Sequence, residues 1–174
     1  MSTTNLPEVW LRGPLSNIPS LLQPVAHTFL QAKEEIIEMM KDFPEEHLWD
    51  RPANVASPAF HLQHITGVID RLFTYAMGQS LTEGQLAALR SEGQAQSQTV
   101  AQLVKALCDK IDWALEQLSS VNEQTLREAR GVGRAQLPST VQGLLFHSAE
   151  HTMRHVGQLL VTTKVIKGIS LAQK

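Results

Sequence analysis

Histidines grouped in two short windows are the residues of this sequence whose type and spacing could do chemistry. Five of the seven stand at His61, His64, His147, His151 and His155. Side chains four residues apart share one face of a helix, so two neighbouring histidines of the second window can reach one ion. Imidazole is a favoured ligand of borderline-soft divalent metals. The spacing therefore predicts a site for one divalent metal ion on a helix.

The second window offers three histidines, and helical projection separates them. At about 100° per residue, the apolar side of this segment defines a buried face, from which His155 lies about 40°, His151 about 80° and His147 about 120°. A site inside a bundle needs inward-facing ligands. The pair His151 and His155 is favoured, whereas His147 is expected at the rim, behind the ligands or in solvent. The residues that define the buried face are Val141, Leu145, Ser148, Thr152, Val156, Leu159 and Ile166.

The first window leaves its choice open. His61 and His64 are three residues apart and lie on one side of a helix. The apolar face of this segment is centred near Ile65 and Leu72, and His61 lies closer to that centre than His64. Projection alone leans toward His61, but a ligand between two helices can lie at the edge of a face. The alternative to a metal site is a buried polar network satisfied by hydrogen bonds.

Five helical segments position these windows. Apolar spacing and capping signals predict helices over residues 24–41, 57–78, 82–90, 95–118 and 139–167. Thr82 with Gln85 and Ser139 with Gln142 form capping-box patterns, and Ser91-Glu92-Gly93 ends the short helix. Residues 119–137 are expected to form a connector without strands. Four long amphipathic segments predict an all-α four-helix bundle.

The first 19 residues differ from the rest. Pro7, Pro14 and Pro19 favour an extended arm, on which Trp10 is expected to dock against the body. The predicted organisation is an N-terminal arm over residues 1–19 and one bundle domain over residues 20–174.

Composition excludes several classes of protein. Lys and Arg number 15 against 17 Asp and Glu, and the net charge is -2, so the chain has no basic excess for nucleic acid. One cysteine favours a reducing compartment. The N-terminus does not resemble a signal peptide, and no apolar stretch reaches the roughly 18 residues of a membrane span. We expect a cytoplasmic protein that binds neither nucleic acid nor membrane.

Several other polar residues are expected to have ordinary roles. Cys108 lies on an apolar helix face and is expected to be a core residue rather than a nucleophile. Asp70 and Arg71 are expected on a solvated helix face more than in contact with the site. Glu150 points away from the core, and the sequence lacks a His-Glu-x-x-His signature, so no general base is assigned.

Two longer motifs resemble a known family. The loop Trp49-Asp-Arg51-Pro52 is followed by Ser57, with His64 seven residues further on, and His155 stands two residues before Gly157-Gln158. Over residues 22–167 this pattern is similar to the DinB-like superfamily of metal-binding four-helix bundles, which includes transferases that use bacillithiol or mycothiol.

The resemblance implies a ligand set and a reaction. It places the metal on His64, His151 and His155, in a bundle of up-down-down-up topology that pairs as a homodimer. Zinc is the favoured ion, with nickel, manganese and iron as alternatives. The implied function is a metal-dependent thiol transferase acting on a small-molecule substrate with a low-molecular-weight thiol. The alternatives are a metal-dependent hydrolase that uses a metal-bound water, or a non-enzymatic, metal-stabilised stress-response or binding module.

Overall fold

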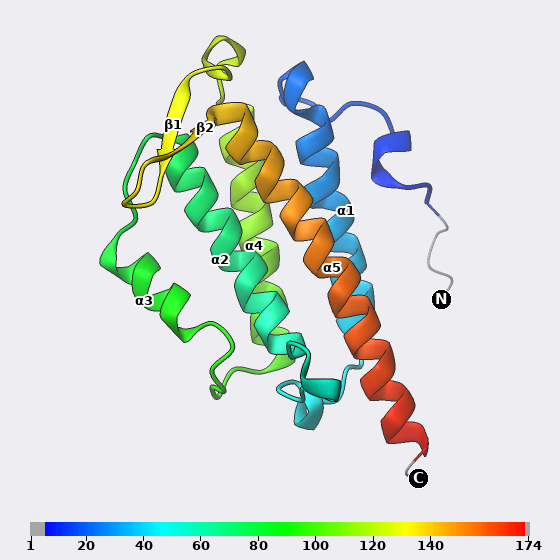
Figure 1. Cartoon of the computed structure of the whole chain (residues 1–174). Helices are drawn as coiled ribbons and strands as arrows, with labels where there is room; N and C mark the ends of the chain where they lie inside the picture. Colours follow the sequence, from blue (N-terminus) through cyan, green and yellow to red (C-terminus); the bar gives the residue numbers. More distant parts are fainter. Residues whose placement is uncertain (1–5, 173–174) are drawn as a thin grey trace.

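Four long helices packed side by side form the body of the protein (Figure 1). The computed structural model describes residues 6–172. The long helices are α1 (Gln23–Met40), α2 (Pro58–Ala76), α4 (Val100–Ser119) and α5 (Val141–Ala172). The colours of Figure 1 show α1 and α5 running one way and α2 and α4 the other. The all-α fold predicted from the apolar spacing is confirmed.

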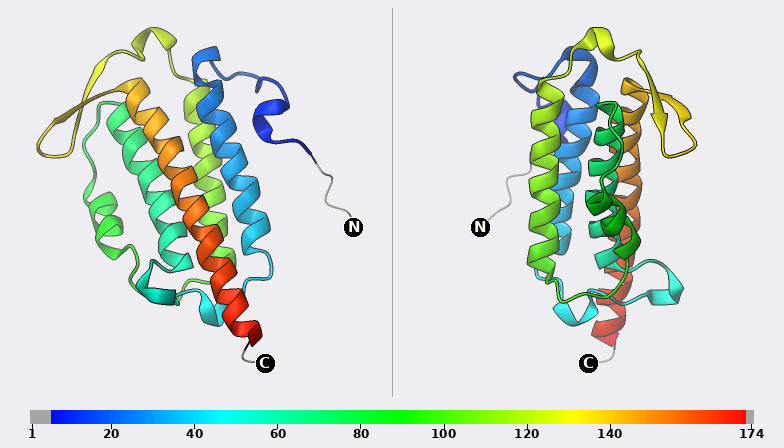
Figure 2. Two further views of the ribbon diagram at one scale, coloured as in Figure 1. Left: turned by 45° about the vertical axis from the view of Figure 1, so that its right-hand side comes forward. Right: turned by 90° about the vertical axis from the view of Figure 1, so that its left-hand side faces the viewer.

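Smaller elements lie at the ends and on one side of this bundle. The short helix α3 (Glu83–Ser91) lies against α2, outside the four-helix body (Figure 2). Among the described residues, no helix is long and apolar enough to cross a membrane. Single turns of 3-10 helix occur at Val9–Leu11, Ser20–Leu22, Glu45–His47, Pro52–Asn54 and Glu123–Thr125.

Apolar side chains at helical spacing fill the interior of the bundle. α2 packs against α4 and α5, and α1 packs against the same two helices, so all four contribute to one core. Burial of such side chains stabilises the fold by about 1.5–3 kcal/mol each. The largest fully buried ones include Phe29, Ile36, Leu62, Ile65, Ile69, Phe73, Leu107, Ile111 and Leu118.

Capping residues set where the helices begin. Ser57 accepts a hydrogen bond from the Phe60 backbone N–H at 3.2 Å and starts α2, as predicted. Thr82 forms the predicted capping box of α3. Thr99 forms a second capping box with Gln102 and starts α4 at Val100, so the prediction of a helix from residue 95 was too early.

A β-hairpin replaces the strandless connector predicted before α5. Strands β1 (Ala129–Val132) and β2 (Leu137–Thr140) pair antiparallel, with Arg130 opposite Ser139. Ser139 therefore lies in a strand, and the predicted capping box with Gln142 was wrong. Thr140 instead accepts from the Gly143 backbone N–H at 3.0 Å, and α5 continues past Gly168, where the sequence suggested an end.

The described part of the N-terminal arm is held on α1. Val9 is 2% exposed, and its backbone N–H donates to Gln31 at 2.9 Å, while Arg12 pairs with Glu34 at 2.6 Å. Trp10, expected to dock, is 62% exposed, so the apolar anchor is Val9. Residues 1–5 of the predicted arm lie outside the described residues.

Candidate metal centre

Three histidines from two adjacent helices converge between α2 and α5. One ligand atom each from His64, His151 and His155 lie within 4.8 Å of one another, and all three side chains are half-buried. The ring centroid of His155 lies 4.6 Å from the ring centroid of His64 and 4.6 Å from that of His151. His64 Nε2 and His151 Nε2 are 3.0 Å apart. Two nitrogens bound tetrahedrally to one zinc ion stand roughly 3.4 Å apart, so this arrangement is close to a ligand set.

Glu92 contacts Nδ1 of His64, whereas Nε2 of the same ring faces His151. This role of Glu92 was not identified from the sequence. Its carboxylate oxygens lie 2.6 Å from His64 Nδ1 and 2.6 Å from the Arg71 guanidinium. Burial opposes ionisation of Glu92, but its hydrogen bonds with His64 and Arg71 outweigh burial and lower the pKa of the carboxyl. In the tautomer that donates Nδ1–H to this carboxylate, His64 keeps the Nε2 lone pair for an ion.

Arg71 lies in a different environment from the one predicted. It was expected on a solvated helix face, but it is only 9% exposed and binds Glu92. The sequence signal for this pairing was weak, because Glu92 lies 28 residues from His64 and follows the end of a short helix. Only the return of the chain along α3 brings the carboxylate back to α2.

His61 is the inward-facing histidine that projection favoured, and it lies behind the cluster. It is 2% exposed, and its Nδ1 lies 3.0 Å from His155 Nδ1. Burial, followed by the neighbouring His64, lowers the pKa of both His61 and His155 to about 4. Both rings are therefore neutral at pH 7, the form in which imidazole binds a metal.

His151 shows that, within the part of the chain that the structure describes, hydrogen bonds do not pair every buried ring nitrogen of the cluster. Burial, followed by its histidine neighbours, lowers its pKa, so it too favours the neutral form. Its Nδ1 is buried without a hydrogen-bond partner within residues 6–172. Buried polar atoms are nearly always paired, so this network is incomplete as a purely hydrogen-bonded one. The lowered pKa values of His151 and His155, together with ring nitrogens that converge with those of His64, fit a bound cation better.

His147 lies at the rim, as projection indicated. Its side chain is 52% exposed and lies 3.3 Å from Glu150, which also pairs with Arg154. His147, Glu150 and His151 form a second group with ligand atoms close together. That group shares His151 with the first, and Arg154 competes for its carboxylate.

A cavity of about 590 Å³ opens beside the cluster, between α5 and the loop before α2. His61 and Arg154 line it, as does Gly157, where a Cβ atom would meet no neighbour within 4 Å. Phe60 stacks on His64 with ring centroids 5.1 Å apart and closes another side of the cluster. The cavity adjoins the cluster through His61, and none of His64, His151 and His155 lines it.

This fold and site define a class: a helical bundle with a histidine cluster between two of its helices. The model of the DinB superfamily matches residues 28–159, and the chain belongs to the DinB superfamily. The family resemblance read from the two motifs is confirmed.

Solved structures share the fold at low sequence identity. A conserved protein from Enterococcus faecalis superposes with a TM-score of 0.62 at 17% identity, covering 84% of this chain and 97% of its own. A protein from Streptococcus pneumoniae gives 0.61 at 14% identity, covering 87% and 92%. The comparison with curated proteins found no match.

Proposed function

We propose that this protein binds one divalent metal ion through His64, His151 and His155. The observation that carries the proposal is the convergence of three half-buried imidazoles from α2 and α5, with one ligand atom of each within 4.8 Å of the others. Zinc is the favoured ion, with nickel, manganese and iron as alternatives, because each accepts imidazole. Three histidines leave a fourth coordination position for a reacting molecule, as catalytic zinc sites do.

Elemental analysis of protein purified without chelators tests the ligand set. We expect about one metal ion per chain for the wild type and near-complete loss in the His64→Ala, His151→Ala and His155→Ala variants. His147→Ala is the matched control, since it removes an imidazole one turn from His151 and should keep the metal. Wild-type protein that is free of metal and takes up none on dialysis would overturn the proposal.

We further propose that the metal-bound protein is a transferase that uses a low-molecular-weight thiol. When bound, the ion would favour the thiolate form of a thiol at the open position. The thiolate sulfur forms a bond to an electrophilic carbon, whose leaving group departs with its electron pair, while the thiol proton passes to solvent. Glu92 fixes the orientation of His64, and the cavity at Gly157, which adjoins the cluster through His61, offers room for the substrate. The family resemblance of the two motifs supports this choice.

Conjugation of 1-chloro-2,4-dinitrobenzene with bacillithiol, mycothiol or glutathione tests the reaction. The expected result is release of chloride with at least one thiol by the metal-loaded wild type and His147→Ala, and a loss of this activity in His151→Ala. Metal-loaded protein that conjugates none of the three thiols above the metal-free level would contradict thiol transfer while leaving metal binding in place. Hydrolysis of p-nitrophenyl acetate by such a protein would favour a hydrolase.

A further inference from the structure

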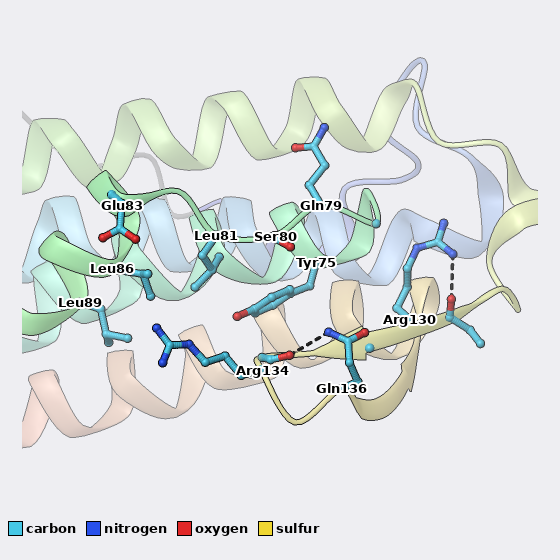
Figure 3. A pocket seen from close by; sticks show the side chains of 14 residues that line it. Tyr75, Gln79, Ser80, Leu81, Glu83, Leu86, Leu89, Arg130, Arg134 and Gln136 are labelled. Atoms are coloured by element: carbon cyan, nitrogen blue, oxygen red, sulfur yellow. Dashed lines mark hydrogen bonds between the residues drawn. The ribbon is translucent and has the colours of Figure 1, made fainter.

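A second cavity lies away from the histidine cluster, where the end of α2, helix α3 and the β-hairpin meet (Figure 3). Its volume is about 660 Å³. Tyr75 in its wall follows His64 by eleven residues on α2, a distance of about 16 Å along a helix. No histidine of the cluster lines this cavity. Volumes of roughly 300–1,000 Å³ are typical of small-molecule sites.

One wall of this cavity is apolar and belongs mainly to α3. Leu86 and Leu89 are three residues apart on one face of α3, and Leu81 precedes the helix. Leu89 is 41% exposed, and α3 has no buried residue. Leu86 is half-buried and Leu89 is exposed, so the apolar face of α3 lines the cavity and is only partly covered by the rest of the protein. An apolar ligand body would remove this face from water.

The hairpin supplies two arginines to the cavity wall, Arg130 and Arg134, which differ in their hydrogen bonds and ion pairs. Arg130 is engaged, because its guanidinium donates to the Ala76 carbonyl at 2.8 Å and pairs with Glu128 at 2.9 Å. Arg134 makes no side-chain hydrogen bond or ion pair within residues 6–172. The turn that carries it is fixed, since the Gln136 side-chain amide donates to the Gly133 carbonyl at 2.9 Å and Gly133 has φ +67°.

Tyr75 adds a second uncommitted donor. Its hydroxyl has no hydrogen-bond partner in the described part of the chain, and its ring lines the same cavity. In Figure 3 the Tyr75 hydroxyl and the Arg134 guanidinium both point toward the α3 side of the cavity. A cation and a neutral donor thus face one apolar wall. Both groups would bind an anion through charge-assisted hydrogen bonds.

We propose that this cavity binds a small monocarboxylate with an apolar body. The carboxylate accepts hydrogen bonds from Arg134 and Tyr75, and the body packs on Leu86 and Leu89. Glu83, which also lines the cavity, carries a negative charge that disfavours a dianion such as a phosphate monoester. The charge of the site therefore matches one negative charge rather than two.

Titration with octanoate tests this site, with backbone amide NMR to locate binding and calorimetry to measure affinity. Saturable shifts are expected at residues 75–90 and 130–136, with 1-octanol binding more weakly because it lacks the charge. Arg134→Gln should weaken octanoate binding about tenfold or more, and Tyr75→Phe by a smaller factor. Arg90→Gln is the matched control, since it removes one positive charge from α3 outside the cavity.

Several results would overturn the proposal. They are an absence of saturable shifts up to the solubility limit, unchanged affinity in Arg134→Gln, or equal affinity for octanoate and 1-octanol. Tighter binding of octyl phosphate than of octanoate would contradict the monocarboxylate class. Leu89→Glu is a second variant for the apolar wall, and it should also weaken binding. Metal content should stay unchanged in every variant, which separates this site from the histidine cluster.

Discussion

Glu92 and His64 meet at 2.6 Å although 28 residues separate them. The second carboxylate oxygen of Glu92 meets Arg71 at 2.6 Å, so one side chain from the end of α3 contacts two on α2. A carboxylate behind a ligand histidine fixes the ring and its tautomer. The proposed metal site thus depends on a residue that would not itself bind the ion.

Replacing this carboxylate should weaken metal binding. We expect Glu92→Gln to lower the affinity for zinc about 10- to 100-fold, because partners behind metal ligands contribute on this scale. Competition with a chromophoric chelator measures the change. Glu116→Gln, at an exposed position of α4, is the matched control. Equal affinities of Glu92→Gln and wild type would show that the carboxylate does not orient His64.

Acid should destabilise the metal-free protein between about pH 6.5 and pH 4. Burial lowers the pKa of His61 to about 4, whereas an unfolded chain has a histidine pKa of about 6.5. In this window the unfolded state binds protons that the folded state does not, so the free energy of unfolding falls as the pH falls. The slope is at most about 1.4 kcal/mol per pH unit for one such histidine.

Urea unfolding of the metal-free protein at several pH values measures this slope. A His61→Leu variant should show a shallower slope, because it removes one of the groups that titrate. Above about pH 7.5 His61 is almost entirely neutral in both the folded and the unfolded state and should contribute little slope. A stability that is flat from pH 7 to pH 4.5 would contradict the burial of neutral histidines.

Shortening a core side chain should cost stability without removing the metal site. Leu107 on α4 is fully buried, and we expect Leu107→Ala to lower the free energy of unfolding by about 2–5 kcal/mol. Chemical denaturation measures the loss. Leu160→Ala on α5, where the side chain is 38% exposed, should cost much less. Similar losses at the two positions would contradict the assigned core.

The two capping boxes should differ in their effect on global unfolding. Thr99→Ala removes the cap of α4, a core helix, and should lower the free energy of unfolding by about 1 kcal/mol. Thr82→Ala removes the cap of α3, which has no buried residue, and should have a smaller effect. Thermal unfolding of the two variants provides the comparison. A larger loss for Thr82→Ala would mean that α3 unfolds together with the bundle.

Local sequence determined much of the bundle. Apolar residues at helical spacing predicted the four long helices, and Ser57 and Thr82 marked helix starts that the structure confirms. The hairpin was missed because its strands are only four residues long and do not alternate in burial. Ser139 was misassigned because pairing with β1 took precedence over its capping potential.

The sequence alone also determined the inward direction of His151 and His155, since helical periodicity fixes which face a residue occupies. His64 followed from its resemblance to a family motif, while periodicity favoured His61. Tertiary structure places His64 Nε2 3.0 Å from His151 Nε2 and His61 Nδ1 3.0 Å from His155 Nδ1, two contacts that periodicity did not predict. It also brought Glu92 to His64. Periodicity acts within one helix, whereas these contacts depend on how helices and connections pack, which no local pattern encodes.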